Sequence, residues 1–177
     1  GFFWSIDNVQ FEIYAVRNAL FFGSASYQQL GFGNSIMQSR PQLLEIMKTL
    51  DVSQIALGQQ HSLAIASVEA QDNFGPVLRK GVLYAWGDNF VGQLGHGDYT
   101  PRGTPVAVRG CLQNDLNGNC IFNFFDLNLV SVACGSFHSL VVSDQGVLYA
   151  WGWNTKGQLG QGVVYTGGNS PTPLVVH

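Results

Sequence analysis

The chain has 177 residues, of which 46% are hydrophobic and 11% are charged, and its formal net charge is −3. This composition excludes an intrinsically disordered chain, and its scattered basic residues, of which only Arg79 and Lys80 are adjacent, lack the clustering of a nucleic-acid-binding surface. No apolar run approaches the about 18 residues of a membrane-spanning helix, and Asp7, Glu12 and Arg17 interrupt the apolar N-terminus, so we expect an intracellular protein, cytoplasmic or nuclear, with no membrane contact.

Residues 20–33, LFFGSASYQQLGFG, are a degenerate first copy of a sequence motif that occurs twice more in the chain. The intact copies are VLYAWGDNFVGQLGHG at 82–97 and VLYAWGWNTKGQLGQG at 147–162. The glycine after the aromatic residues is Gly23, Gly87 and Gly152, so the copies are 64 and 65 residues apart. Similarity at a fixed register indicates one supersecondary unit used repeatedly, and such units must stack because none can bury its apolar face alone.

Residues 41–50, PQLLEIMKTL, are the only segment with a helical pattern. Pro41 suits a first helical position, and apolar residues follow at near-helical spacing, at Leu43, Leu44, Met47 and Leu50. The equivalent stretch after Pro105 lacks this pattern, so the sequence allows a helix in one copy only.

The remaining segments have the pattern of short β-strands. ALGQQHSLAIA at 56–66 and ACGSFHSLVVS at 133–143 precede the two intact copies. These runs are rich in β-branched and aromatic residues and are bounded by Gly, Asn, Asp or Ser, which favour turns. Residues 83–86 show no polar alternation, so we expect both faces of that strand to be covered.

The histidines in these segments invite a catalytic interpretation, but repetition favours a structural one. His61 and His138 occupy equivalent places, and each precedes a serine. A catalytic group is needed once, whereas a structural group recurs with its scaffold, and neighbouring residues of a strand point to opposite faces. The sequence also lacks a nucleophile elbow and a phosphate-binding loop. We therefore predict no catalytic residue, no cofactor and no enzymatic activity.

The segment 109–128 is a surplus over the other copy and carries most of the cysteines and several aromatic residues. Three phenylalanines within four positions could anchor a partner or a neighbouring unit, and Trp153 replaces the Asp88 of the sister copy, so the candidate partner contacts are Phe122, Phe124, Phe125 and Trp153. Cys111 and Cys120 could form a disulfide in an oxidising compartment, although free thiols are the preferred interpretation. Cys134 is expected to be a small buried apolar residue.

No metal site is predicted. The cysteines lack the close pairs of a zinc site. The segment from Asp115 to Asp126 has polar residues at positions 1, 3 and 5 of a calcium loop, but Cys120 stands where the loop needs glycine.

The two segments GQQHSLAIA…GVLYAWGDNFVGQLGHG and GSFHSLVVSDQGVLYAWGWNTKGQLGQG resemble repeats of the regulator of chromosome condensation family. The resemblance implies an all-β fold, a seven-bladed β-propeller with four strands and about fifty residues per blade. The structural residues of the repeat are His61, Trp86, Gly87, Gly92, Leu94 and Gly95 in one copy, and His138, Trp151, Gly152, Gly157, Leu159 and Gly160 in the other.

On this template the chain is an incomplete arc, with two full blades and parts of two more. The predicted units are a partial blade at 1–40, a blade at 41–97, a blade at 105–162 with the insertion 109–128, and the start of a further blade at 163–177. Within the first unit, GFFWSI at 1–6 stands in the place of HSLAIA, and residues 7–17 form a hairpin insertion. A closed ring would need at least about 350 residues, so we expect the chain to be part of a longer polypeptide.

Three functions remain open at this point. The first is a non-catalytic scaffold that binds other proteins through its loops. The second is a guanine-nucleotide exchange factor for a small GTPase, as the founding family member is. The third is an accessory propeller of a larger enzyme, such as a ubiquitin ligase. Fold alone does not choose among them. The family also includes a plant ultraviolet-B photoreceptor, but its clustered Trp and Arg have no counterpart here, because GQQHS and GSFHS hold neither residue.

Overall fold

The computed structural model describes residues 3–6, 9–14, 18–72, 75–114, 117, 120–162 and 168–177. Within them, only the backbone is described for residues 3–18, 70–72, 111, 113–114 and 120–122.

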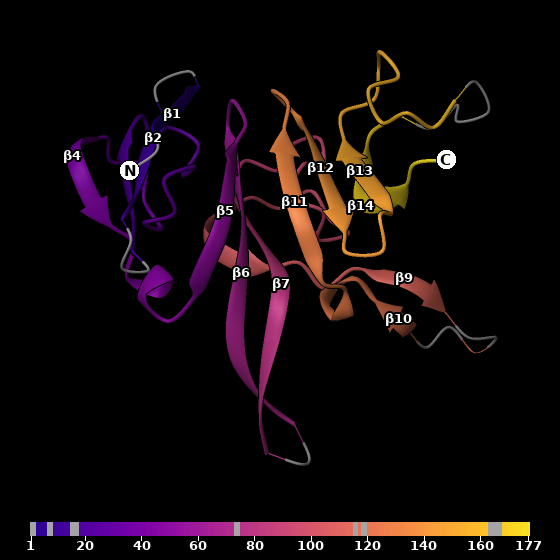
Figure 1. Cartoon of the computed structure of the whole chain (residues 1–177). Coiled ribbons are helices and arrows are strands. Elements are labelled where there is room, and N and C mark those ends of the chain that lie inside the picture. Colours follow the sequence, from indigo (N-terminus) through magenta and orange to yellow (C-terminus); the bar gives the residue numbers. More distant parts are fainter. Residues whose placement is uncertain are drawn as a thin grey trace.

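The described residues form three four-stranded antiparallel sheets that lie side by side (Figure 1). The first sheet contains β1 (Phe3–Ile6), β2 (Val9–Tyr14), β3 (Asn18–Gly23) and β4 (Gln38–Leu43). The second contains β5 (Asp51–Leu57), β6 (His61–Asp72), β7 (Gly75–Gly87) and β8 (Arg102–Ala107). The third contains β11 (Leu129–Cys134), β12 (His138–Ser143), β13 (Leu148–Gly152) and β14 (Ser170–Val175). The all-β prediction of an open arc of four-stranded blades is therefore confirmed.

Three smaller elements connect the sheets. The strands β9 (Cys111–Asn114) and β10 (Cys120–Asn123) pair as a separate hairpin. Two 3-10 turns, η1 (Glu45–Lys48) and η2 (Phe124–Asp126), each precede the first strand of the following sheet. No helix in the described part of the chain has the length and apolar character needed to cross a membrane.

The first sheet corrects the predicted arrangement of residues 1–17. Gly87 pairs with His61, and Gly152 pairs with His138. In the first sheet, Gly23 pairs with Val9 of β2. Residues 9–14 are therefore the strand equivalent to HSLAIA, and the segment is part of the sheet instead of a hairpin insertion. The sequence gives no sign of this equivalence, because Val9 stands where the other two copies have histidine.

The predicted blade boundaries are also displaced by one strand. Pro41 lies in β4, which pairs with β3 and completes the first sheet. Pro105 lies in β8 and completes the second sheet in the same way, and β14 completes the third. A unit that begins at 41 or 105 in the sequence thus begins with the last strand of the preceding sheet. The segment at the C-terminus closes a blade rather than opening one.

The predicted helix at 41–50 is reduced to η1. Residues up to Leu43 belong to β4, because a chain that pairs with β3 satisfies its backbone polar groups in the sheet. The short turn that remains buries Met47 against the first core cluster.

Two apolar clusters fill the spaces between successive sheets. The residues of β7 alternate between them, with Val82, Tyr84 and Trp86 in the first cluster and Leu83 and Ala85 in the second. A central strand buried on both faces needs apolar residues at every position. This explains why residues 83–86 show no polar alternation.

The outermost strand of each sheet carries proline, at Pro41, Pro105, Pro171 and Pro173. Proline has no N–H to donate to a further strand, so these edges resist pairing with another chain.

Candidate functional site

The junction between successive sheets is built around one backbone carbonyl. In the first junction, the Trp86 indole Nε1 and the Ser62 hydroxyl both donate to the Gln29 carbonyl oxygen, at 2.9 and 2.8 Å. In the second, Trp151 Nε1 and Ser139 Oγ donate to the Gln93 carbonyl oxygen, at 2.9 and 2.7 Å. All of these side chains are buried. The repeated tryptophan therefore ties successive blades together by a hydrogen bond as well as filling the core.

The glutamines of this loop were not among the predicted repeat residues. The side-chain Oε1 of Gln29, Gln93 and Gln158 accepts the backbone N–H two residues earlier, at 2.9, 3.0 and 2.8 Å. In the first two copies the carbonyl of this glutamine faces the next sheet. The signal was available, because glutamine occupies this position in all three copies, including the degenerate one.

The histidine of the second sheet also reaches across a junction. His61 Nε2 lies 3.0 Å from Ser139 Oγ of the third sheet, whereas the hydroxyl of its sequence neighbour Ser62 donates to the Gln29 carbonyl. Because the Ser139 hydroxyl donates to Gln93, its oxygen accepts from His61, which places the histidine proton on Nε2. His138, the equivalent residue of the last sheet, is half-buried.

Burial makes His61 a source of pH-dependent stability. Its pKa is lowered from 6.5 to about 3, first because burial penalises the imidazolium and second because of the charge of His138. The folded state therefore excludes a proton that the unfolded chain binds below pH 6.5, and stability falls from pH 6.5 down to about pH 3. We expect a loss of about 2 kcal/mol at pH 5. Urea unfolding of the wild type and of His61→Gln at several pH values measures it.

The difference between the two proteins should change with pH over this range and stay constant above it. His138→Gln, at the half-buried equivalent position, serves as the control and should show a smaller change. A pH dependence that is unaltered in His61→Gln would contradict the assignment.

A second junction contact links β5 of the second sheet to β11 of the third. The amide of Gln54 in β5 donates to the Val130 carbonyl at 2.6 Å and accepts from the Val132 N–H at 3.2 Å. The side chain thus satisfies the exposed edge of β11 as a paired strand would. No repeat signal could have revealed it, because the equivalent residue in the third sheet is Ser131.

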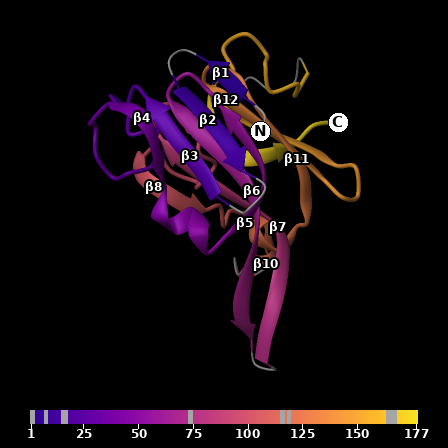
Figure 2. The same ribbon diagram turned by 60° about the vertical axis from the view of Figure 1, so that its left-hand side comes forward.

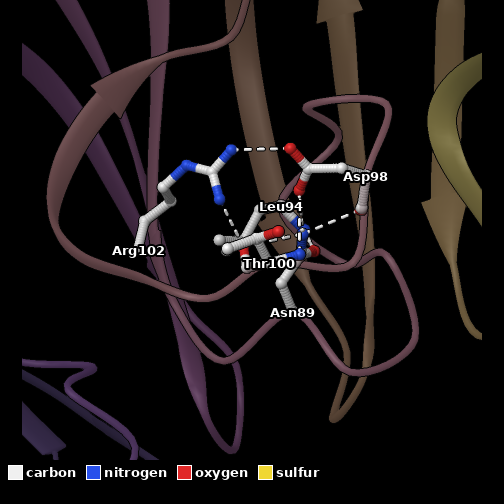
Figure 3. Close-up of polar contacts among 5 residues, drawn as sticks. All are labelled: Asn89, Leu94, Asp98, Thr100 and Arg102. Carbon is white, nitrogen blue, oxygen red and sulfur yellow. Dashed lines mark hydrogen bonds and ion pairs between the residues drawn. The ribbon is translucent and has the colours of Figure 1, made fainter.

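The loop between β7 and β8 is held rigid by a polar network (Figure 3). The Asn89 amide nitrogen donates to the Asp98 carbonyl, the Asp98 carboxylate and the Thr100 carbonyl, at 2.8, 3.1 and 3.1 Å. Its oxygen accepts from the Leu94 N–H at 3.0 Å. Arg102 closes the loop by an ion pair with Asp98 at 2.7 Å. The ion pair and the backbone N–H of Thr100 lower the pKa of the Asp98 carboxyl despite an opposing burial effect.

This rigid loop exposes aromatic side chains that the sequence interpretation passed over. Phe90 is 80% exposed and Tyr99 is 52% exposed. Phe90 stands where the other copies have Ser26 and Thr155, and that departure was the signal that could have found it. An exposed aromatic ring on a loop that is already ordered can bind a partner at a small entropic cost.

The four predicted partner contacts are placed differently by the structure. Trp153 is half-buried, and its ring meets Phe137 edge-on, with centroids 5.9 Å apart. Phe125 is half-buried and accessible. Phe124 is not available as a partner contact, because it is fully buried and packs edge-on against Tyr149 and Trp151 of the third sheet, with ring centroids 5.4 and 5.9 Å apart. This is the predicted alternative in which the segment anchors a neighbouring unit. Phe124 occupies the core between the second and third sheets, so the insertion ends before it. The side chain of Phe122 lies outside the described residues.

The remaining chemical predictions concern cysteines and metals. Cys134 is a free thiol that packs against the second core cluster, and burial raises its pKa. The side chains of Cys111 and Cys120 lie outside the described residues, as do most residues of the rejected calcium loop. The described part of the chain contains no group of three or more His, Cys, Asp or Glu side chains that could hold a metal ion.

The chain is similar to known proteins over most of its length. A family model described as the regulator of chromosome condensation (RCC1) repeat matches residues 19–65, 80–142 and 145–176, and a second model of the same repeat matches residues 129–158. Human HERC6, a probable E3 ubiquitin-protein ligase, is 31% identical over 84% of this chain and 12% of its own length. The ultraviolet-B receptor UVR8 of Arabidopsis thaliana is 34% identical over 80% of this chain and 26% of its own length. The chain therefore spans only a small part of these relatives.

Solved structures show the same fold. Human WBSCR16 is 25% identical with a TM-score of 0.66, and the match covers 96% of this chain and 37% of that protein. Prp20p of Saccharomyces cerevisiae is 20% identical with a TM-score of 0.70, and the match covers 99% of this chain and 38% of that protein. Because the family model covers well over half of the residues, the chain belongs to the regulator of chromosome condensation (RCC1) repeat family.

Proposed function

We propose that this chain is a non-catalytic protein-binding scaffold, and that it works as part of a larger intracellular protein or assembly. The observation that carries the proposal is Phe90, a large apolar side chain that is 80% exposed on a rigid loop. Exposed aromatic residues on preorganised surfaces are typical anchors of protein interfaces. The junctions beneath this loop are closed by buried hydrogen bonds, so the scaffold can present it without rearranging.

Trp153 supports the same surface. It follows β13 in the next sheet, as Phe90 follows β7, so both residues lie at the end of the sheets where the third strand finishes. Its contact with Phe137 orients the indole while leaving part of it accessible. We propose that Phe90 is the principal anchor and that Trp153 is a secondary contact.

Replacing Phe90 with alanine is expected to weaken partner binding about tenfold or more without unfolding the protein, because anchor residues each account for a large share of binding energy. The test is quantitative recovery of bound proteins from cells that express the tagged full-length protein. Leu78→Ala is the matched control, because Leu78 is 55% exposed on a different surface. Equal recovery by both variants and the wild type would contradict the proposal.

Assays of the same full-length protein distinguish the scaffold function from the other two candidate functions. Prp20p, which shares the fold, binds Gsp1p and histones. If the full-length protein released bound nucleotide from a purified small GTPase, its function would be guanine-nucleotide exchange and the scaffold proposal would be wrong. If an adjoining domain of the full-length protein transferred ubiquitin and Phe90→Ala abolished that transfer, the chain would be an accessory module of a ubiquitin ligase.

A further inference from the structure

Two insertions project from the same end of the sheets (Figures 1 and 2). The hairpin of β6 and β7 continues as a two-stranded arm, from the pair Val68–Arg79 to the pair Asp72–Gly75, beyond the last pairing of β6 with β5 at Ser67. The second insertion is the hairpin of β9 and β10, which lies between β8 and η2 in the chain. This end is opposite to the loop that carries Phe90, because Phe90 follows the other end of β7.

A cluster of four side chains joins the base of the arm to η2, and we call Arg79, Arg109, Phe125 and Asp126 the arginine cluster. The guanidinium carbons of Arg79 and Arg109 lie 5.3 and 4.3 Å from the centroid of the Phe125 ring. Arg79 Nη1 also forms an ion pair with Asp126 at 2.7 Å. The cluster therefore holds two cations on one half-buried aromatic ring.

The charges of the arginine cluster are unequal. Asp126 compensates Arg79, whereas Arg109 is exposed and forms no ion pair with any described residue. A guanidinium that stacks on an aromatic ring is oriented, and the donors at its edge remain free for a planar acceptor. Carboxylates match that geometry through two parallel hydrogen bonds.

We propose that the arginine cluster binds an acidic segment of a partner protein, with a carboxylate on Arg109 as the main contact and the remaining guanidinium nitrogens of Arg79 as the second. The proposal rests on the proposed scaffold function but uses a separate surface. A protein ligand is favoured over nucleic acid, because two guanidiniums on a chain of net charge −3 do not form an extended basic stripe.

The binding of a short fluorescein-labelled peptide of alternating glutamate and serine, followed by fluorescence anisotropy at low ionic strength, tests the proposal on the intact chain. Arg109→Gln is expected to weaken binding about tenfold, because one charge-assisted contact is lost. Arg109→Lys should recover only part of the affinity, since lysine lacks the planar fork. Lys80→Gln is the matched control and should change affinity less than about twofold. This substitution also removes one positive charge. Lys80 is next to Arg79 in the sequence, but the alternation of side chains along β7 places Lys80 on the other face.

Equal losses in Arg109→Gln and Lys80→Gln would overturn the proposal, because the effect would then be only that of net charge. So would tight binding of the peptide in which glutamine replaces glutamate, or a stronger preference for a phosphoserine peptide or a single-stranded oligonucleotide. Circular dichroism and thermal unfolding of each variant exclude misfolding as the cause of a loss. If the peptide fails to bind while Phe90→Ala still reduces partner recovery, the acidic ligand is wrong and the scaffold function stands.

Discussion

Trp151→Ala is expected to destabilise the chain by about 3–5 kcal/mol, the usual cost of truncating a buried tryptophan. The side chain is fully buried between the second and third sheets, where its ring packs on Phe124. Its removal leaves a cavity that the surrounding strands cannot close, because their hydrogen-bonded registers prevent collapse. It also removes one of the two donors to the Gln93 carbonyl. Equilibrium unfolding in urea measures the loss.

The neighbouring tryptophan provides the control. Trp153→Ala removes the same side chain from a half-buried position on the loop, with an expected cost of about 1 kcal/mol from the lost contact with Phe137. Trp86→Ala, at the equivalent junction, should resemble Trp151→Ala, because Trp86 is equally buried and also donates to a glutamine carbonyl. Comparable losses for Trp151→Ala and Trp153→Ala would contradict the junction model.

Gly95→Ala is expected to cost about 3 kcal/mol, for two reasons that add. Gly95 has a φ of 77°, a conformation that costs about 1 kcal/mol for a residue with a Cβ atom. A Cβ atom there would lie 2.7 Å from the Trp151 indole nitrogen, so the indole must shift away from the Gln93 carbonyl, at about 1–3 kcal/mol for an overpacked core. Thermal and urea unfolding measure the sum.

Gly157→Ala separates the two contributions. Gly157 has nearly the same φ, 76°, but an added Cβ atom would meet nothing within 4 Å. This variant should show the backbone cost alone, about 1 kcal/mol. If the two variants lose the same stability, the contact with the indole does not limit the residue at position 95.

The molecule divides structural and binding roles between its junctions and its loops. The junction residues are buried, repeated and intolerant of change. The variable positions, Phe90, Trp153 and the insertions at the other end, lie outside the junctions. A rigid frame with changeable loops allows binding surfaces to vary without loss of the fold.

The sequence by itself determined the β-rich repeat and its glycine-marked loops. The reason is that each depends on local pattern and on repetition along the chain. The burial of both faces of residues 83–86 could also be predicted from the sequence, since a strand between two apolar cores shows no alternation of polar and apolar residues. Even the glutamine that bends each loop was visible as a repeated letter, although its role was not.

The tertiary structure alone decided which strands share a sheet and which side chains meet. The strand that begins each predicted sequence unit pairs with the preceding strand in the chain and completes the preceding sheet. The spacing of the repeats does not reveal this, because strand pairing depends on hydrogen bonds between segments that are distant in the sequence. His61 meets Ser139 instead of Ser62, and Phe124 enters the core while Phe125 joins two arginines. Adjacent residues diverge in this way because each faces a different neighbouring element, and only the packed arrangement of sheets sets which neighbour that is.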